Sequence, residues 1–420
     1  MSDIRQSLDA LERRDPQQRE DQLMQRLPAL LQRAQAAPGW GRILGGVDAS
    51  AVRSRQDLAR LPVTRKSDLA DLQARQAPFG GLTTTPARQL RRLFVSPGPI
   101  HDPEGHGADW WRFSSPMHAL GLGPGHIVQN CFAYHFTPAA FMVEGAAARL
   151  GCAVIPAGIG QTELQVHAMS TLRPDAYIGT PSFLRIIIEK ALEMGADISS
   201  VGRALLSAEA LPPALRSWFH AHGVPLVLQL YASADIGNIA YETATDGVVH
   251  PGMLLDEELI LEIVRPGTGD PLPAGEVGEV VVTSFNPDYP LLRFGTGDLS
   301  ATIDGRSPCG RTNTRIKGWM GRADQTTKVR GMFVHPAQVA EVLRRHGEVR
   351  RARLVVSGEM ANDIMTLHCE VADAANPGFE VSTLAATLRE VTKLRGEVLL
   401  VAPGGLPNDG RVIEDARKYE

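Results

Sequence analysis

Short apolar runs alternate with helical stretches between residues 90 and 230, and this alternation is the strongest pattern in the chain. The apolar runs span residues 92–95, 127–131, 153–156, 176–179, 203–206 and 225–230. Strands that alternate with helices typically form a parallel sheet covered by helices. Within this region Thr162 and Gln165 have the spacing of a capping box, which predicts a helix running to about residue 172. The predicted fold class is therefore α/β.

The regions on either side of this alternation have different patterns. Residues 1–36 form a mostly polar helical pattern, and residues 61–73 predict a turn and a helix capped by Thr64 or Ser67. After residue 248, two β-rich runs at 259–265 and 278–285 flank the turn-dense sequence PGTGDPLPAGE, which predicts a hairpin.

Beyond residue 323 the chain predicts a compact mixture of helices and strands. The helices are expected at 336–345 and 382–394, and the strands at 351–356, 364–371 and 397–401. We therefore predict two domains. A large α/β domain covers residues 1–323, with a β-rich part at about 248–320, and a small α+β domain covers residues 324–420.

Composition and charge narrow the class of protein. Of the 420 residues, 43% are hydrophobic and 21% are charged, as in ordinary globular domains. A net charge of −4 provides no basic field, so neither nucleic acid nor an anionic membrane is an expected partner. The most apolar long stretch, 138–160, is broken by charged residues and glycines and does not predict a membrane span. A polar N-terminus and four cysteines without a CxxC pair favour a cytoplasmic protein.

Three segments carry residues suited to chemistry. In LLRFGTGDLS, the Asp298 carboxylate follows a tight Thr-Gly turn and could accept hydrogen bonds from a ribose diol, although an ordinary turn also fits. In residues 318–343, Arg322 could contact a phosphate or ribose and Asp324 lies at the interdomain link, although a charged linker also fits. In residues 228–242, Tyr231 could stack on a base and Asp235 could hold Mg²⁺ at the end of a buried strand, although a capped loop also fits.

Together, the order and spacing of these segments resemble the adenylate-forming enzymes, and among them the phenylacetate–CoA ligase group. The resemblance covers roughly residues 58–345. Further segments that resemble the group are LPVTRKSDL, IGTPSFL, LLSAEALPPALR, HPGMLLDEELILEIVRPGTGDPLPAGEVGEVVVTSF and CGRT.

This resemblance implies an AMP-forming acid–thiol ligase that uses ATP, Mg²⁺ and CoA. A carboxylic acid attacks the α-phosphate of ATP to give an acyl-adenylate, and CoA then attacks the acyl carbon and expels AMP. The resemblance also implies that the C-terminal domain is a mobile lid, which turns between the two steps about a hinge at Asp324.

By the same resemblance, the site residues fall into groups. Asp298 would bind the ribose hydroxyls, Arg322 would support the ribose or phosphate, and Asp235 would hold Mg²⁺. The adenine site would be lined by Ala208, Glu209 and Tyr231, and the phosphate loop would keep Ser96 and Gly98. The segment 130–136 resembles the wall of the acid pocket, where Phe132, Tyr134, His135 and Phe136 would suit an aromatic acid. Core packing is the alternative reading of that run.

The sequence departs from the group's pattern at three places. The phosphate loop should be rich in Ser, Thr and Gly and end in Gly-Lys. Here it reads FVSPGPIHDPEG, where Pro97 and Pro99 have no N–H and Asp102 and Glu104 add negative charge. The expected Thr-Glu is Ala234-Asp235. Near the C-terminus the expected catalytic lysine is missing, and Arg411 stands in its place or beside it.

Three functions therefore remain open: a CoA ligase, an enzyme that transfers the acyl group to a non-CoA acceptor, and a nucleotide- or acyl-adenylate-binding homologue deficient in turnover. The sequence leaves the acid, the acceptor and the oligomeric state open, with a homodimer as one candidate.

Overall fold

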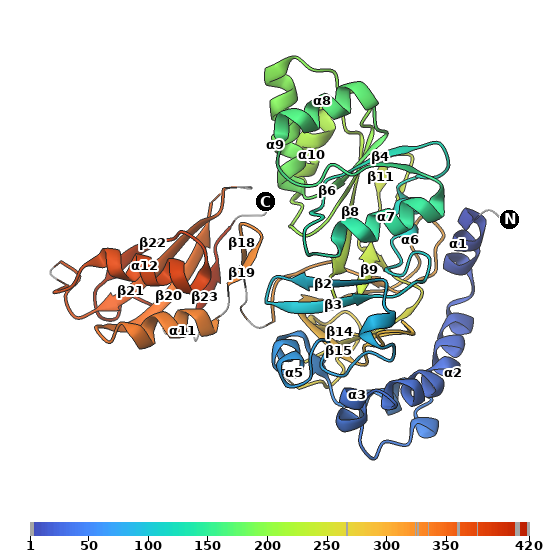
Figure 1. Cartoon of the computed structure of the whole chain (residues 1–420), viewed down its shortest axis with the longest axis horizontal. Helices are drawn as coiled ribbons and strands as arrows, with labels where there is room; N and C mark the ends of the chain where they lie inside the picture. The colour runs from blue at the N-terminus through green and yellow to red at the C-terminus, as the bar shows by residue number, and fades with distance from the viewer. Residues whose placement is uncertain are drawn as a thin grey trace. The chain divides into compact units, whose positions relative to one another are not determined.

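The computed structural model describes residues 4–265, 268–323, 325, 327–334, 336–358, 362–375, 377–407 and 412–417. The chain divides into two compact units, Met1–Gly321 and Arg322–Glu420 (Figure 1). The division lies two residues before the domain boundary that the sequence predicts. None of the helices in the described ranges is long and apolar enough to cross a membrane.

A nine-stranded sheet forms the centre of the first unit, as far as the structure describes it, in the order β16-β17-β12-β9-β8-β7-β6-β4-β5. Five neighbouring strands are parallel, which confirms the predicted parallel sheet: β4 (Ile127–Asn130), β5 (Ala153–Ile155), β6 (Ala176–Gly179), β7 (Arg203–Leu206) and β8 (Leu226–Ser233). The sheet continues with antiparallel strands: β9 (Gly237–Tyr241), β12 (Met253–Leu255), β17 (Arg315–Ile316) and β16 (Thr302–Ile303).

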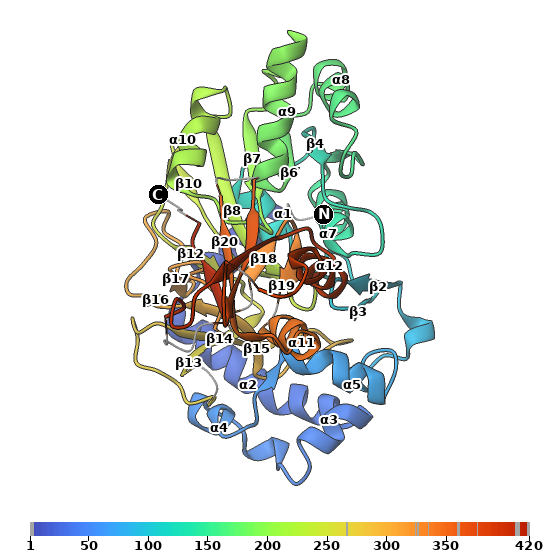
Figure 2. The ribbon, with the colours of Figure 1, turned by 90° about the vertical axis from the view of Figure 1, so that its left-hand side faces the viewer.

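Helices connect the parallel strands, and both ribbon views place α8–α10 at the opposite end of the first unit from α2 and α3 (Figures 1 and 2). The connecting helices are α7 (Ala139–Leu150), α8 (Thr162–Leu172), α9 (Pro181–Met194) and α10 (Pro213–Ala221), and α6 (Ser114–Ala119) precedes the first of these strands. Helix α9 begins with an N-cap hydrogen bond from the Phe183 N–H to the Thr180 side chain. The capping box predicted for α8 is wrong, because Thr162 is already the first helical residue and no side chain caps this helix.

The first apolar run of the alternation is not part of the parallel sheet, which corrects the sequence interpretation. It forms β2 (Arg92–Ser96), which pairs antiparallel with β3 (Ile100–Glu104) in a separate two-stranded hairpin. The reversal takes only residues 97–99, whose sequence is Pro-Gly-Pro. Polar residues and a proline occupy most of β3, so its sequence has no strand pattern.

A second sheet has the order β1-β15-β14-β13, and it confirms the predicted hairpin between β13 (Leu259–Val264) and β14 (Gly278–Ser284). Strand β1 (Thr64–Arg65) runs parallel to β15 (Phe294–Ser300), so the residues after β1 lie beside β15. The turn η2 (Lys66–Asp68) and helix α5 (Leu69–Arg75) follow. Neither Thr64 nor Ser67 caps α5, because Thr64 belongs to β1 and Ser67 to η2.

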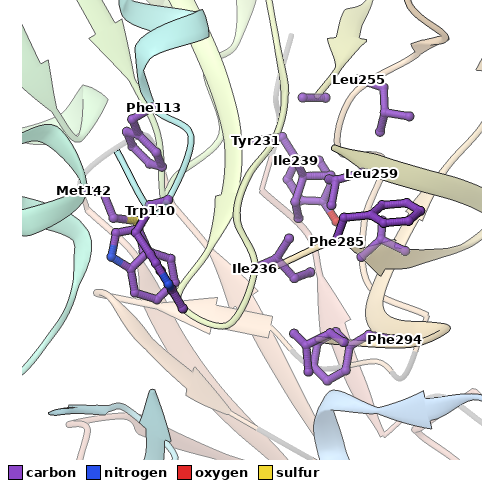
Figure 3. Close-up of a cluster of buried hydrophobic side chains, with 14 of the residues drawn as sticks. Trp110, Phe113, Met142, Tyr231, Ile236, Ile239, Leu255, Leu259, Phe285 and Phe294 are labelled. Atoms are coloured by element: carbon purple, nitrogen blue, oxygen red, sulfur yellow. The ribbon is translucent and has the colours of Figure 1, made fainter. Parts of the chain in front are cut away.

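One large hydrophobic core joins these sheets and helices. Figure 3 shows the Tyr231 side chain within this cluster, together with Ile236, Ile239 and Phe294. The N-terminal helices pack on the same core through Leu27 and other leucines of α2. The remaining elements of the unit are α1 (Ile4–Arg13), α2 (Pro16–Gln35), α3 (Pro38–Ile43), η1 (Ala49–Ala51), α4 (Arg55–Ala59), η3 (Ala87–Gln89), β10 (Ala244–Thr245) and β11 (Val248–Val249).

The second unit is an α+β structure with its own core, which includes Leu354, Leu367 and Leu384. Its four-stranded sheet has the order β22-β21-β20-β23, and β18 and β19 form a small hairpin. The elements are β18 (Thr327–Val329), β19 (Met332–Val334), α11 (Pro336–Arg345), β20 (Val349–Ser357), β21 (Ile364–Val371), α12 (Val381–Thr392), β22 (Glu397–Val401) and β23 (Ile413–Asp415). The helices and strands that the sequence predicts here are present, with shifts of one or two residues at some ends.

Candidate functional site

Tyr231 on β8 and Asp298 on β15 come together although 67 residues separate them. The Tyr231 hydroxyl donates a hydrogen bond of 2.8 Å to Oδ2 of Asp298. The indole N–H of Trp319 donates to Oδ1 of the same carboxylate at 3.1 Å. A carboxylate can accept about four hydrogen bonds, so these contacts are compatible with binding of a ribose diol.

The Thr-Gly-Asp turn is stabilised by the side chain of Thr296 and by the backbone conformation of Gly297. The backbone N–H of Asp298 donates to the Thr296 hydroxyl at 3.1 Å. Gly297 has a φ of 75°, in the left-handed region that glycine adopts without strain. This local geometry fixes the direction of the Asp298 side chain.

A second charged pair, Lys66 with Asp235, belongs to the same unit. The Lys66 ammonium lies 2.5 Å from Oδ2 of Asp235, and the Lys66 side chain is 25% exposed while that of Asp235 is fully buried. Burial lowers the pKa of Lys66, but the charges of Asp235, Asp102 and Asp298 outweigh this effect, so the net shift is upward and the ammonium stays charged. Asp235 lies in the turn between β8 and β9, beyond the end of the strand.

Sequence reasoning did not single out Lys66. Its segment, LPVTRKSDL, carried part of the family resemblance, yet no role was assigned to the lysine. The signal that could have found it is its rarity, because the chain has six lysines and this one follows a short strand that pairs with the strand of Asp298.

Asp102 on β3 is a further buried acid whose charge acts on this pair. Its side chain is fully buried, and neither carboxylate oxygen has a hydrogen-bond partner among the described residues. Burial raises its pKa to about 8, the charge of Asp235 adds to the rise, and the charge of Lys66 and the nearby Ser96 side chain oppose it. Within the same described ranges, Oδ1 of Asp235 and the buried hydroxyl of Tyr289 also have no hydrogen-bond partner.

The predicted phosphate loop is the short turn at 97–99 between β2 and β3. Ser96 is buried, and its hydroxyl donates to the carbonyl of Ile100 at 3.2 Å. Gly98 is exposed and has a φ of 153°. Glu104 is neutralised by two hydrogen bonds from Arg92, at 2.9 and 3.0 Å. Because the raised pKa of about 8 keeps the Asp102 carboxyl protonated near pH 7, neither acid adds an unbalanced negative charge here, which corrects the sequence interpretation.

Ala208 and Glu209 follow β7, and Tyr231 lies near the end of the neighbouring β8. The carboxyl ends of adjacent parallel strands meet at one edge of a sheet, where ligands bind in open α/β folds. Ala208 has a φ of 71°, a conformation that a residue with a Cβ rarely adopts. The Glu209 carboxylate accepts hydrogen bonds from the N–H and hydroxyl of Ser182, at 3.1 and 2.9 Å.

The segment expected to form the wall of the acid pocket is only partly buried. Phe132 is buried, and the hydroxyl of the half-buried Tyr134 donates to Glu144 at 2.7 Å. His135 and Phe136 are exposed, Phe136 to 76%. The structure of this unit thus brings Phe132 and Tyr134 against the core and leaves the other two aromatic residues at its surface.

Comparison with known proteins identifies the family. A model of the AMP-binding enzyme family matches residues 112–286. The phenylacetate–coenzyme A ligase of Thermus thermophilus is 31% identical over 349 residues, which cover 80% of this chain and 77% of that protein. The chain belongs to the phenylacetate–coenzyme A ligase family. The family predicted from the sequence is therefore confirmed.

A second phenylacetate–coenzyme A ligase and two solved structures are also similar to this chain. The Escherichia coli phenylacetate–coenzyme A ligase is 29% identical over 70% of this chain and 68% of that protein. A crystal structure of 2-hydroxyisobutyryl-CoA ligase, in complex with 2-HIB-AMP and CoA, is 25% identical with a TM-score of 0.83 over 98% of this chain and 92% of that one. The amide bond synthetase McbA from Marinactinospora thermotolerans shares the fold, with a TM-score of 0.54 at 17% identity over 93% of this chain and 92% of that one.

The remaining residues predicted from the family pattern belong to the second unit. Arg322 begins that unit, and its guanidinium carbon lies 5.8 Å from the centre of the Phe333 ring. Asp324 and Arg411 lie outside the described residues. The roles assigned to these three residues remain predictions.

Few of the described side chains are placed to bind Mg²⁺. No group of three or more His, Cys, Asp or Glu side chains in the described ranges is arranged to hold a metal ion. Mg²⁺ is commonly bound through one or two carboxylates, together with substrate phosphates and water. Oδ1 of Asp235 is buried and has no hydrogen-bond partner within the part of the chain described, so Asp235 fits the role of a single carboxylate ligand to an ion shared with a nucleotide.

Proposed function

We propose that this protein is an AMP-forming acid–CoA ligase that activates a carboxylic acid as an acyl-adenylate and passes the acyl group to CoA. Membership of the phenylacetate–coenzyme A ligase family supports this proposal. The observation that carries it is the meeting, within one unit, of the Tyr231–Asp298 pair with Lys66 and Asp235. These residues offer a diol acceptor, an aromatic ring and a partly buried cation, which together suit an adenylate.

The two half-reactions assign different tasks to these residues. In the first, an oxygen of the acid bonds to the α-phosphorus of ATP and the bond to pyrophosphate breaks. In the second, the sulfur of CoA bonds to the acyl carbon, AMP leaves, and the thiol proton is released. Asp298 and Tyr231 hold the adenosine through both steps.

Lys66 is the residue we assign to charge stabilisation. A preorganised cation next to the α-phosphate lowers the energy of the charge that develops there. The Asp235 carboxylate holds the Lys66 ammonium in position. Mg²⁺, when bound through Asp235, would supply further neutralisation of the phosphates.

The class of acid is a separate part of the proposal. Phe132 and Tyr134 are aromatic residues in the segment that resembles the acid wall, and rings of this kind pack well against a flat aryl group. The hydroxyl of Tyr134 is held by Glu144 and by the amide of Asn130, at 2.7 and 2.9 Å, so its ring has a defined orientation. We therefore propose an aromatic acid as the substrate.

The second unit, residues 322–420, is proposed to be the lid of this enzyme, with Asp324 as its hinge and Arg411 in the role of the family's lysine. We also propose a cytoplasmic location, which the four free cysteines support. A homodimer remains a prediction.

A second candidate function is an adenylate-binding protein with little turnover from ATP. The short turn at 97–99 favours it, because two of its three residues are prolines without an N–H to offer to a phosphate. Transfer to a non-CoA acceptor is distinguished from both candidates by the dependence of product formation on CoA.

The test is an assay of pyrophosphate release and thioester formation with Mg·ATP, CoA and a panel of aryl acids that begins with phenylacetate. We expect both products from the wild type and much less of both from Asp298→Ala. Pyrophosphate without any thioester would indicate another acceptor. The absence of both products, together with the absence of AMP binding, would contradict the proposed function.

A further inference from the structure

A side chain distant in sequence holds the turn between β8 and β9. Nη2 of Arg112 donates hydrogen bonds to the carbonyls of Ile236 and Asn238, at 2.7 and 3.2 Å. Ile236 is the residue directly after Asp235, and Asn238 lies in β9. Arg112 therefore fixes the backbone immediately after the carboxylate that we assign to Mg²⁺.

The guanidinium of Arg112 is itself anchored by a buried acid. Its Nε lies 2.9 Å from Oδ1 of Asp256, and the two side chains are 14% and 3% exposed. The other oxygen of Asp256 accepts a hydrogen bond of 2.8 Å from the side-chain amide of Asn238. A guanidinium presents several donors in one rigid plane, so it can join a carboxylate and two carbonyls at the same time. Arg112 thus ties the turn to Asp256.

The backbone around Arg112 is packed directly against the same turn. Arg112 has a φ of 61°, a conformation that is costly for a residue with a side chain and that is common at functional sites. The carbonyl of the preceding residue, Trp111, accepts a hydrogen bond of 3.0 Å from the Asn238 N–H. A Cβ on Gly237 would lie only 2.6 Å from that carbonyl oxygen. The segment that carries Arg112 and the turn that carries Asp235 are therefore in close backbone contact.

We propose that Arg112 is a positioning residue for Mg²⁺, because it orients the turn so that Asp235 can bind both Lys66 and the ion. The inference rests on the proposed function, which makes Asp235 the Mg²⁺ ligand. One oxygen of Asp235 is bonded to Lys66 at 2.5 Å, and the other is buried without a hydrogen-bond partner in the described part of the chain. Groups that hold a metal ligand set its orientation and so tune the affinity for the metal. Loss of Arg112 should weaken Mg²⁺ binding and spare the adenosine contacts of Tyr231 and Asp298.

Two double variants separate this role from a general loss of stability. Arg112→Met, Asp256→Asn removes the hydrogen bonds to the turn and both charges, so no unpaired charge is left buried. Arg216→Met, Glu242→Gln is the matched control. Arg216 donates to Glu242 at 2.8 and 2.9 Å and to the Val227 carbonyl at 2.6 Å, near the other end of β8 and β9. The control removes a similar ion pair and a similar carbonyl contact from the same two strands, away from the turn.

The experiment measures binding of α,β-methylene-ATP by calorimetry to the full-length wild type and both double variants. Each dissociation constant is measured in EDTA and in saturating Mg²⁺, and their ratio reports how far the ion strengthens binding. The Arg112 variant should lower this ratio by about tenfold or more, since loss of a group that holds a metal ligand typically costs about 10–100-fold in metal affinity. Its affinity for AMP in EDTA should change by less than about threefold, because distant sites usually act independently. The Arg216 variant should keep both wild-type values.

Four results would overturn the inference, and they differ in what else they contradict. An unchanged ratio in the Arg112 variant refutes the role of Arg112 while the proposed function stands. An equal loss in the Arg216 variant, or a matching loss of AMP affinity, would show a general loosening of β8 and β9 and also leaves the proposed function standing. If Mg²⁺ does not strengthen binding to the wild type, the assignment of Asp235 as its ligand fails. If neither AMP nor the ATP analogue binds to any form, the proposed function itself fails.

Discussion

The two ends of the candidate site differ in how many of their polar groups have hydrogen-bond partners. The proposed adenosine end contains Tyr231 and Asp298, and the proposed phosphate end contains Lys66, Asp235 and Asp102. At the adenosine end, Asp298 accepts hydrogen bonds from Tyr231 and Trp319, and Thr296 fixes the turn. At the phosphate end, the described structure leaves Asp102 and one oxygen of Asp235 without hydrogen-bond partners. Preorganised donors and acceptors favour binding, because little reorganisation is needed when the ligand arrives. The polar groups at the proposed adenosine end are therefore held in place by hydrogen bonds in the described structure, whereas the Asp102 carboxyl and one oxygen of Asp235 at the proposed phosphate end are not.

The largest expected effect comes from removing the cation at the phosphate end. Lys66→Met should slow thioester formation from a synthetic acyl-adenylate and CoA by about 10²–10³, as loss of one preorganised charge typically does. It would also leave Asp235 buried and unpaired, which costs about 3–5 kcal/mol of stability. The double variant Lys66→Met, Asp235→Asn avoids that cost and serves as the control for folding. A normal rate in the double variant would show that Lys66 does not act on the reacting groups.

At the adenosine end, Asp298→Ala should weaken AMP binding through the loss of charge-assisted hydrogen bonds of about 1.5–3 kcal/mol each. Calorimetry with AMP measures this effect. Asp298→Asn keeps the shape and one acceptor, so it should bind with intermediate affinity. Unchanged affinity in a folded Asp298→Ala protein would place the ribose elsewhere and remove the basis of the comparison.

Tyr231→Phe should have a smaller effect, because it removes the hydroxyl and keeps the ring. We expect AMP binding to weaken by about 0.5–1.5 kcal/mol, the usual contribution of one hydrogen bond. The effect arises indirectly, since the hydroxyl holds Asp298. The double variant Tyr231→Phe, Asp298→Ala should therefore bind no more weakly than Asp298→Ala alone, and fully additive losses would argue against coupling between the two residues.

The smallest expected effect is on stability, and it belongs to the phosphate end. Burial raises the pKa of Asp102 from 3.8 to about 8, so the folded chain keeps a proton that the unfolded chain releases between these values. The stabilising contribution of the protonated form is complete below the unfolded pKa and is lost as the pH rises toward about 8. Asp102→Asn does not titrate and should exceed the wild-type Tm by about 2 °C or more at pH 9, with a smaller gain at pH 5. An equal difference at both pH values would mean that Asp102 is not protonated in the fold.

Much of the fold could be predicted from the sequence, because the strands of a covered parallel sheet are short apolar runs separated by helices. Residues 176–179 and 203–206 are examples in which the predicted and observed strands coincide. Strand β3 was missed because its residues are polar and its pairing comes from the tight turn before it. The caps predicted for α5 and α8 were wrong because the identity of the capping residue depends on where the helix starts. Sequence patterns define that start only to within a few residues.

For the site, motifs placed Tyr231, Asp235 and Asp298, and the structure brings Tyr231 and Asp298 into contact. Lys66 was missed because its place beside the other site residues depends on the pairing of β1 with β15, a long-range contact that no local pattern predicts. The pairing of Arg92 with Glu104, and not with Asp102, also could not be predicted, since it depends on the position of Arg92 across the hairpin. Residues identified by local motifs were thus easier to predict than those defined by their neighbours in space.

The most direct test of the central claim is a crystal structure of the protein with a non-hydrolysable phenylacetyl-adenylate analogue. We expect the ribose hydroxyls within hydrogen-bond distance of the Asp298 carboxylate, the adenine beside Tyr231 and Ala208, and the phosphoryl group of the analogue beside Lys66. An analogue bound with its ribose away from Asp298, or with its phosphoryl group away from Lys66, would contradict that claim.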